Sequence, residues 1–110
     1  MRIPEFRRNA LYKRSLDLFH EVFRTIEEEG EQLEKIEVVI MRKRVLRITK
    51  KVTLAIVQQN IKIKYKSLNE AKGELVNLLE HLYQFCNEGK IEDWNGFIID
   101  YYAEQVMKLL

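Results

Sequence analysis

Apolar residues recur at steps of three and four along the first part of the chain, a spacing that places them on one face of an α-helix. The pattern predicts a helix over residues 10–29. Asn9 precedes it, and we expect its side-chain oxygen to accept a free backbone amide of the first turn. Gly30 is expected to end the helix in a left-handed conformation. The apolar stripe consists of Leu11, Tyr12, Leu16, Phe19, Phe23 and Ile26.

A second and longer helix is predicted over residues 32–60. Its outward face is expected to be basic, centred on Lys43, Arg47, Lys50 and Lys51. Its many β-branched residues lower helix propensity, so we expect packing to hold it in place. The positions assigned to the inward face are Leu33, Ile36, Ile40, Met41, Val45, Ile48, Val52 and Ala55, widened by Val39, Leu46 and Ile56.

Residues 61–66 alternate between apolar and basic side chains, a pattern typical of a half-buried strand. A single strand would have no partner in this chain, so we interpret the segment as a fraying helix end and connector. Ser67 and Glu70 then match a capping box, in which each side chain satisfies a free amide at the other position. This match predicts a third helix over residues 67–88 that stops at Gly89.

The last helix is predicted over residues 93–109, with Asp93 as its N-cap. Its apolar side chains cover more of the circumference than one stripe, and the surplus would most simply meet another subunit. Only one proline and four glycines interrupt the chain, which favours long helices with short connections. We therefore predict an all-α, antiparallel, up-down-up-down four-helix bundle that forms a single domain over residues 1–110.

Composition narrows the class of protein. Apolar residues make up 46% of the chain, which argues against disorder. Charged residues make up 33%, and the apolar runs are too short to span a bilayer. Cys86 is the only cysteine, so no internal disulfide can form. With an N-terminus unlike a signal peptide, this composition indicates a reducing, cytoplasmic setting.

Charge is segregated along the chain. Residues 42–66 contain nine lysines and arginines and no acidic residue, whereas residues 27–37 contain six glutamates and one lysine. A face of this kind can neutralise phosphates and give salt-sensitive, sequence-independent affinity for nucleic acid. The alternatives are a solvated helix face or an intramolecular partner for the acidic run. The candidate phosphate-binding residues are Arg42, Lys43, Arg44, Arg47, Lys50, Lys51, Lys62 and Lys64, with Lys66 extending the track.

No catalytic or metal-binding motif accompanies the basic residues. His20 and His81 each lack a second histidine or cysteine at helical ligand spacing. Cys86 lies beside the apolar stripe of its helix, which favours a packing role over nucleophilic chemistry. No glycine-rich phosphate loop occurs. The sequence thus predicts a protein without enzymatic activity, metal or cofactor.

Aromatic residues gather on the last predicted helix. They could line a ligand pocket or form a contact between subunits. Tryptophan and tyrosine supply large contact areas with a polar tip, so we favour an oligomer interface. The residues concerned are Trp94, Phe97, Tyr101 and Tyr102.

The order of these motifs resembles a known family of four-helix bundles. The step Glu21-Val22-Phe23 is similar to the family's opening helix, and the basic second helix ending at Asn60-Ile61 also fits. The third helix is the best match, through Leu68, Ala71-Lys72-Gly73, Glu74-Leu75, Leu82 and Gly89-Lys90-Ile91. The family contains the large-subunit rRNA intervening-sequence proteins and the accessory variability determinants of diversity-generating retroelements.

The resemblance implies a ring-like homo-oligomer, typically a pentamer, without enzymatic activity. In the retroelement branch it implies binding to a reverse transcriptase and to RNA. Our leading hypothesis is therefore a nucleic-acid-binding accessory protein that contacts RNA or DNA through the basic second helix. The alternative hypothesis is a structural or scaffolding oligomer that binds a protein partner.

Overall fold

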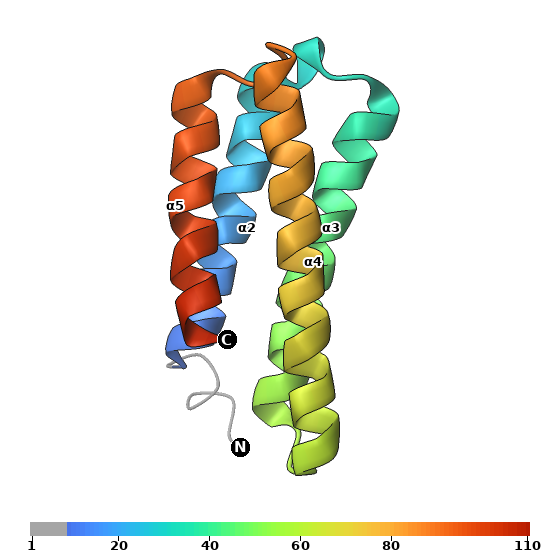
Figure 1. The fold of residues 1–110 in the computed structure, drawn as a ribbon, viewed down its shortest axis with the longest axis vertical. Coiled ribbons are helices and arrows are strands. Elements are labelled where there is room, and N and C mark those ends of the chain that lie inside the picture. Colours follow the sequence, from blue (N-terminus) through green and yellow to red (C-terminus); the bar gives the residue numbers. More distant parts are fainter. Residues whose placement is uncertain (1–8) are drawn as a thin grey trace.

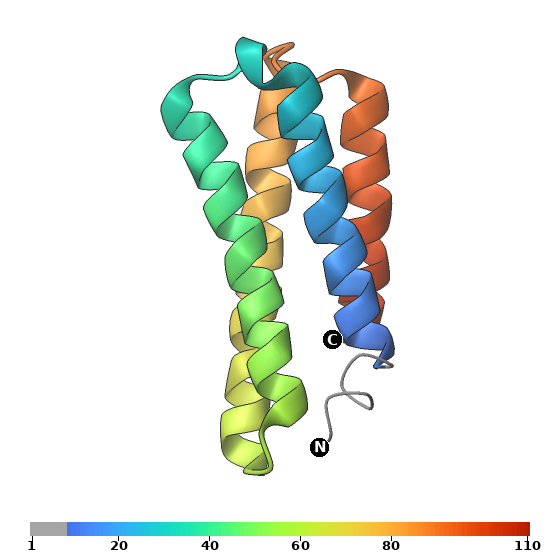
Figure 2. The ribbon, with the colours of Figure 1, turned by 180° about the vertical axis from the view of Figure 1, so that it is seen from behind.

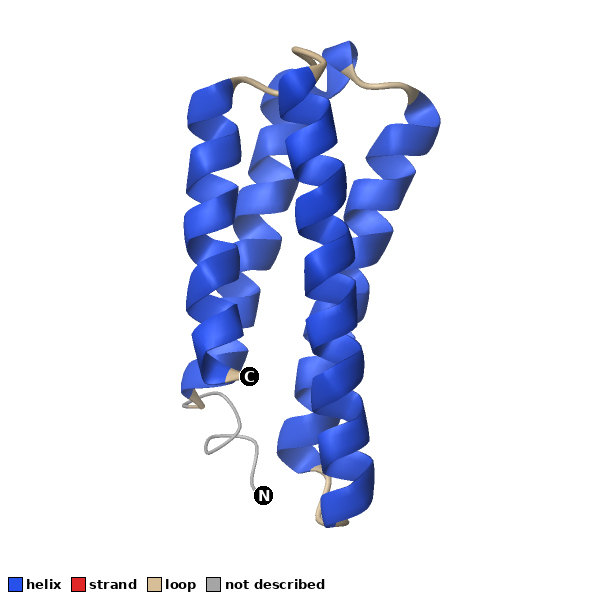
Figure 3. Ribbon diagram, viewed as in Figure 1, coloured by secondary structure: helices blue, strands red, loops and turns tan. Residues whose placement is uncertain are grey.

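Four long helices form the fold in a computed structural model that describes residues 9–110. They are α2 (Ala10–Glu29), α3 (Lys35–Val57), α4 (Ile61–Asn87) and α5 (Asp93–Leu109). A short 3-10 turn, η1 (Gly30–Gln32), joins α2 to α3. Figure 3 shows that the regular elements of the described chain are all helices.

The helices run antiparallel to their neighbours, as the sequence predicts (Figure 1). Helix α2 packs against α3 and α5, and α4 packs against α3 and α5. The hairpin of α3 and α4 is longer than the pair α2 and α5 and projects beyond it, as both views show (Figures 1 and 2). The all-α, antiparallel four-helix architecture is therefore confirmed.

The core lies along the axis shared by the four helices. Its fully buried side chains come from one stripe of each helix and from Ile91 in the connection between α4 and α5. The chain folds in this way because each stripe is satisfied only against the others. The largest of these side chains are Leu18, Met41, Ile48, Leu75, Leu78, Leu82, Ile91 and Ile99.

Helix α2 begins and ends close to the predicted residues. The Asn9 side chain accepts hydrogen bonds from the amides of Leu11 and Tyr12 at 2.9 and 3.2 Å, so the predicted N-cap is confirmed. The predicted left-handed Gly30 is wrong, because Gly30 has φ −58° and ψ −19°. The chain keeps its right-handed turn there and tightens into η1 instead.

Helix α3 is shorter than the predicted range of residues 32–60. It begins at Lys35 because η1 and an extended Glu34 intervene. The Glu37 carboxylate accepts a hydrogen bond from the Glu34 amide at 2.8 Å and caps the first turn. The helix ends at Val57, before an extended Gln58.

Three apolar residues assigned to the inward face of α3 are exposed instead. Ile36 is 60%, Val39 53% and Leu46 49% exposed. Successive residues of a helix are about 100° apart, so Leu46 cannot share the inward direction of the fully buried Val45. Helix α3 thus carries two apolar stripes, one facing the core and one facing outward.

Helix α4 begins six residues earlier than predicted. The Asn60 side chain accepts hydrogen bonds from the amides of Lys62 and Ile63 at 3.0 and 3.3 Å, so the helix starts at Ile61. The interpretation of residues 61–66 as a fraying connector is wrong. The predicted capping box is also wrong, since Ser67 lies buried within the helix.

The end of α4 follows the prediction. Gly89 has φ +73°, a conformation that favours glycine. The Gly89 amide donates to the Cys86 carbonyl at 3.1 Å, and the Lys90 amide donates to the Phe85 carbonyl at 2.9 Å. These two bonds satisfy carbonyls that the helix end leaves free, so Gly89 is confirmed as the stop.

Helix α5 begins at Asp93, but Glu92 occupies the N-cap position that we had predicted for Asp93. The Glu29 carboxylate from the end of α2 accepts hydrogen bonds from the Glu92 amide at 2.7 Å and the Asn95 side chain at 2.8 Å. A negative charge is favourable at a helix N-terminus, so Glu29 ties α2 to α5.

Candidate functional site

The outward face of α3 brings four of the predicted cations together. Arg42, Lys43, Arg47 and Lys50 are exposed and surround a shallow depression of about 390 Å³. Val39 and Leu46 complete its lining. No carboxylate belongs to that lining. The positive charges of Arg42, Lys43 and Lys50 are therefore available to an anionic ligand, whereas the exposed Arg47 also lies 3.7 Å from the Glu74 carboxylate of α4. Apolar surface lies between these cations.

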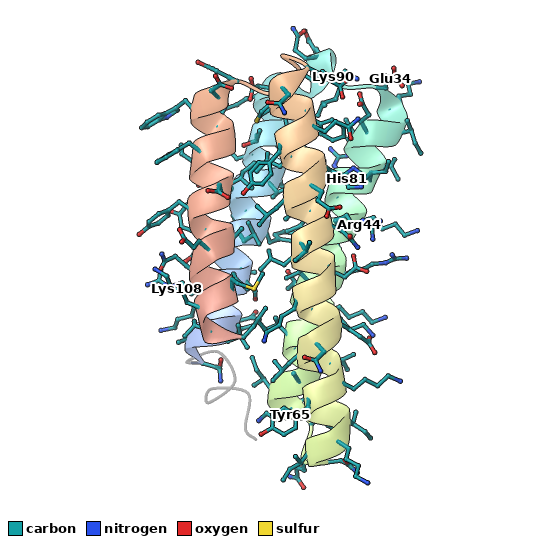
Figure 4. All side chains as sticks on the ribbon, in the orientation of Figure 1. Glu34, Arg44, Tyr65, His81, Lys90 and Lys108 are labelled. Carbon is teal, nitrogen blue, oxygen red and sulfur yellow. The ribbon has the colours of Figure 1, made fainter. Side chains whose placement is uncertain are left out.

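The other two candidate cations of α3 are turned toward α4. The Arg44 guanidinium lies 3.0 Å from the Glu74 carboxylate, and the Lys51 ammonium lies 2.5 Å from Glu70. Arg47 also reaches Glu74, at 3.7 Å. The hydrogen bond from Lys51 lowers the pKa of Glu70 below its usual range. Figure 4 shows Arg44 beside α4, so Arg44 and Lys51 act mainly between helices.

Arg42 marks the border with α2. Its guanidinium carbon lies 5.6 Å from the centre of the Phe23 ring, a cation–π distance. The Phe23 ring stacks on Phe19 with centroids 4.4 Å apart. Arg42 remains exposed, so this contact orients its side chain and leaves its charge accessible.

Lys62 and Lys64 lie apart from the other candidates. Both are exposed on the first turns of α4, where the longer hairpin ends (Figure 1). Neither forms an ion pair with a carboxylate of the described chain. Tyr65, labelled near this tip in Figure 4, is 62% exposed. The tip is a second basic surface, separated from the depression by the last turns of α3.

The aromatic residues of α5 lie largely outside the core. Trp94 and Phe97 are each 66% exposed and Tyr101 is 53% exposed, whereas Tyr102 is half-buried and packs against the core. The Trp94 and Phe97 rings stack with centroids 6.2 Å apart. The surplus apolar surface predicted for the last helix is therefore present. Its role as an oligomer interface stays a prediction.

The residues considered for metal binding or catalysis do not converge. His20 is exposed against Phe19, and His81 stacks on Phe85 of its own helix, with ring centroids 5.9 Å apart. Across residues 9–110, no group of three histidine, cysteine, aspartate or glutamate side chains could hold a metal ion.

Cys86 faces Gly96 across the contact between α4 and α5. A Cβ atom on Gly96 would fall well inside the contact distance of the Cys86 sulfur, so glycine permits the close approach. Burial raises the pKa of the Cys86 thiol, and the nearby charges of Asp93 and Glu29 raise it further. A raised pKa keeps the thiol protonated and weakens it as a nucleophile.

Two surface features were missed in the sequence. One is the apolar patch that Val39 and Leu46 place among the cations of α3. Steps of three and four also connect Ile36, Val39, Lys43, Leu46 and Lys50, so a search for a second stripe would have found it. The other is the set of carboxylates that α2 brings beside the aromatic residues of α5, which no local pattern indicates.

Comparisons with known proteins add no family assignment. The chain matches no protein-family model, no curated protein and no solved structure. The four-helix all-α domain therefore rests on the structure itself. None of the described helices is long and apolar enough to cross a membrane.

Proposed function

We propose that this protein is a non-enzymatic, nucleic-acid-binding accessory protein whose phosphate-binding residues are Arg42, Lys43, Arg47 and Lys50. The observation that supports the proposal most is the clustering of these four exposed cations around one depression without a lining carboxylate. They span nine residues of α3, or about 12 Å along the helix axis, which suits several consecutive phosphates.

The proposal assigns smaller roles to the other cations. Arg44 and Lys51 have carboxylate partners on α4 at 3.0 and 2.5 Å, so a phosphate would have to compete with Glu74 and Glu70. The contact of Arg47 with Glu74 is longer, at 3.7 Å, so Arg47 is kept among the phosphate-binding residues. Lys62 and Lys64 would contact nucleic acid only if the strand continued to the tip of the α3–α4 hairpin. Binding through these groups is expected to depend on charge more than on sequence, because no aromatic side chain that could stack on bases lines the depression.

The family resemblance extends the proposal to a biological setting. In the retroelement branch, the protein would assist a reverse transcriptase and bind its RNA. In either branch of the family, the resemblance favours assembly of the copies into a ring, typically a pentamer. Several α3 faces on one assembly would raise the avidity for a long strand.

Fluorescence anisotropy with labelled single-stranded RNA and DNA tests the proposal. The variant Lys43→Gln with Lys50→Gln removes two phosphate contacts. For single strands each contact contributes a slope of roughly −0.7 in log affinity against log salt. The slope should therefore become shallower by about 1.4, and the affinity at 0.1 M salt should fall roughly 25-fold.

A charge-matched control uses two exposed lysines outside α3. Lys13→Gln with Lys108→Gln changes the net charge equally, on α2 and α5. Figure 4 shows Lys108 on α5, away from α3. This control should lower the affinity much less. Absence of binding at low salt, or an equal loss in both double variants, would refute the proposal.

A protein-binding scaffold is the second candidate function. The specific observation in its favour is the exposed apolar surface that the cations enclose, because Leu46 and Val39 offer nothing to a phosphate. This candidate predicts that Leu46→Gln abolishes capture of a partner protein and leaves RNA affinity unchanged.

A further inference from the structure

A groove of about 720 Å³ runs between α2 and α5 on the face away from the core. Trp94, Phe97 and Tyr101 line its α5 side at steps of three and four residues. The first two rings lie nearly parallel, with an interplanar angle of 12°. These side chains present a continuous aromatic ridge, and more than half of each is exposed.

Carboxylates line the same groove. Glu21 and Glu28 come from α2, and Glu92 comes from the turn before α5. Arg24 is the only cation in the lining, and its guanidinium already contacts Glu21 at 2.8 Å and Glu28 at 2.9 Å. Three carboxylates against one guanidinium leave the groove negative. It therefore differs in charge from the depression on α3.

We propose that this groove binds a basic amphipathic helix from a protein partner. An amphipathic helix can place its apolar face in a groove between two helices. Its lysines or arginines could then lie over the exposed ring faces, where cations are attracted, and near the free carboxylate oxygens. Nucleic acid does not fit this site, because phosphates would be repelled by Glu21, Glu28 and Glu92.

A second copy of this chain is the competing occupant, since its α3 has a basic outward face and the sequence predicts an oligomer interface at the same aromatic residues. Under the proposed function, the outward face of α3 binds phosphates, so we favour an occupant of the groove that comes from another protein. The groove itself is separate from α3, and its occupancy can be tested without reference to nucleic acid.

Fluorescence polarisation with a labelled synthetic helix tests the proposal. The probe is a leucine–lysine peptide with leucines at steps of three and four, and a leucine–glutamate peptide of the same pattern is its counterpart. The basic peptide should bind and the acidic peptide should not. Trp94→Ala with Phe97→Ala should weaken binding at least about tenfold, since exposed aromatic anchors of this kind carry much of the binding energy of interfaces.

Glu28→Gln with Glu92→Gln should weaken the same binding and reduce its salt dependence. All four side chains are exposed, so these variants should keep the circular dichroism spectrum of the parent chain. The double variant Lys43→Gln with Lys50→Gln should bind the basic peptide normally, which separates this site from the proposed nucleic-acid surface.

Three results would overturn the inference. The first is equal binding of the basic and acidic peptides. The second is basic-peptide binding that survives loss of Trp94 and Phe97. The third is light scattering that shows an oligomer of the parent chain and a monomer of the Trp94→Ala, Phe97→Ala variant, because the groove would then hold a second copy.

Discussion

The start of α4 yields the sharpest stability prediction, because two rival N-caps lie in the same segment. The structure places the cap at Asn60, whose side-chain oxygen accepts from two amides of the first turn. The local sequence instead favours Ser67 with Glu70. The substitution Asn60→Ala should therefore destabilise the protein, whereas Ser67→Ala should not.

Loss of an N-cap side chain costs about 1 kcal/mol of protein stability. Asn60 is exposed, and water can partly replace its bonds, so the cost of Asn60→Ala should lie near this value and not above it. For a domain of this size the melting temperature should fall by about 4 °C. Ser67 lies inside the helix, where alanine is favoured over serine by a few tenths of a kcal/mol, so Ser67→Ala should be neutral or slightly stabilising.

Urea denaturation followed by circular dichroism measures both effects in one assay. Gln59→Ala is the matched control, because Gln59 is exposed in the connector and outside both helices. The reasoning fails if Ser67→Ala costs about 1 kcal/mol while Asn60→Ala is neutral. That result would place the start of α4 at Ser67.

Three further predictions concern packing and charge. Leu46→Ala should change stability by less than about 0.5 kcal/mol, whereas Ile48→Ala should cost about 2–5 kcal/mol; equal losses in urea denaturation would contradict the outward position of Leu46. Gly96→Ala should lower the melting temperature, and adding Cys86→Ala should restore part of it; additive losses would argue against the close contact of the two residues. Glu37→Gln should lower the melting temperature at neutral pH. Because hydrogen bonds from Lys90 and from the Glu34 amide lower the pKa of Glu37 in the folded state, its contribution is complete above the unfolded pKa and is lost as the pH falls through the folded pKa. The difference between parent and variant should therefore shrink in acid, and a constant difference would contradict the assignment.

Much of the fold could be predicted because the helical periodicity agrees with the residues that cap or end the helices. Asn9 and Gly89 each have local chemistry that favours a single outcome, and both were predicted correctly as helix boundaries. Where two signals competed, the sequence analysis favoured the wrong one, Ser67 with Glu70. Asn60 also suits an N-cap, and in the structure its side chain accepts hydrogen bonds from the Lys62 and Ile63 amides, so α4 starts six residues before Ser67.

The candidate site was only partly predictable for a similar reason. The sequence identifies the cations of α3, but it does not say which of them meet carboxylates on α4. Arg44 and Glu74 are far apart in the chain, and only the packing of α3 against α4 joins them. Likewise, the sequence alone does not separate the two apolar stripes of α3. The outward stripe, which contains Val39 and Leu46, can be recognised only when the structure shows which side of the helix faces the core.

The most direct test of the central claim is a nuclear magnetic resonance titration of the labelled protein with short single-stranded RNA at low salt. The claim that α3 carries the nucleic-acid surface predicts that amide shifts cluster at residues 39–50, around Lys43 and Arg47, and fade as salt is added. Shifts centred on Trp94 and Phe97 of α5, or no shifts at any RNA concentration, would contradict it.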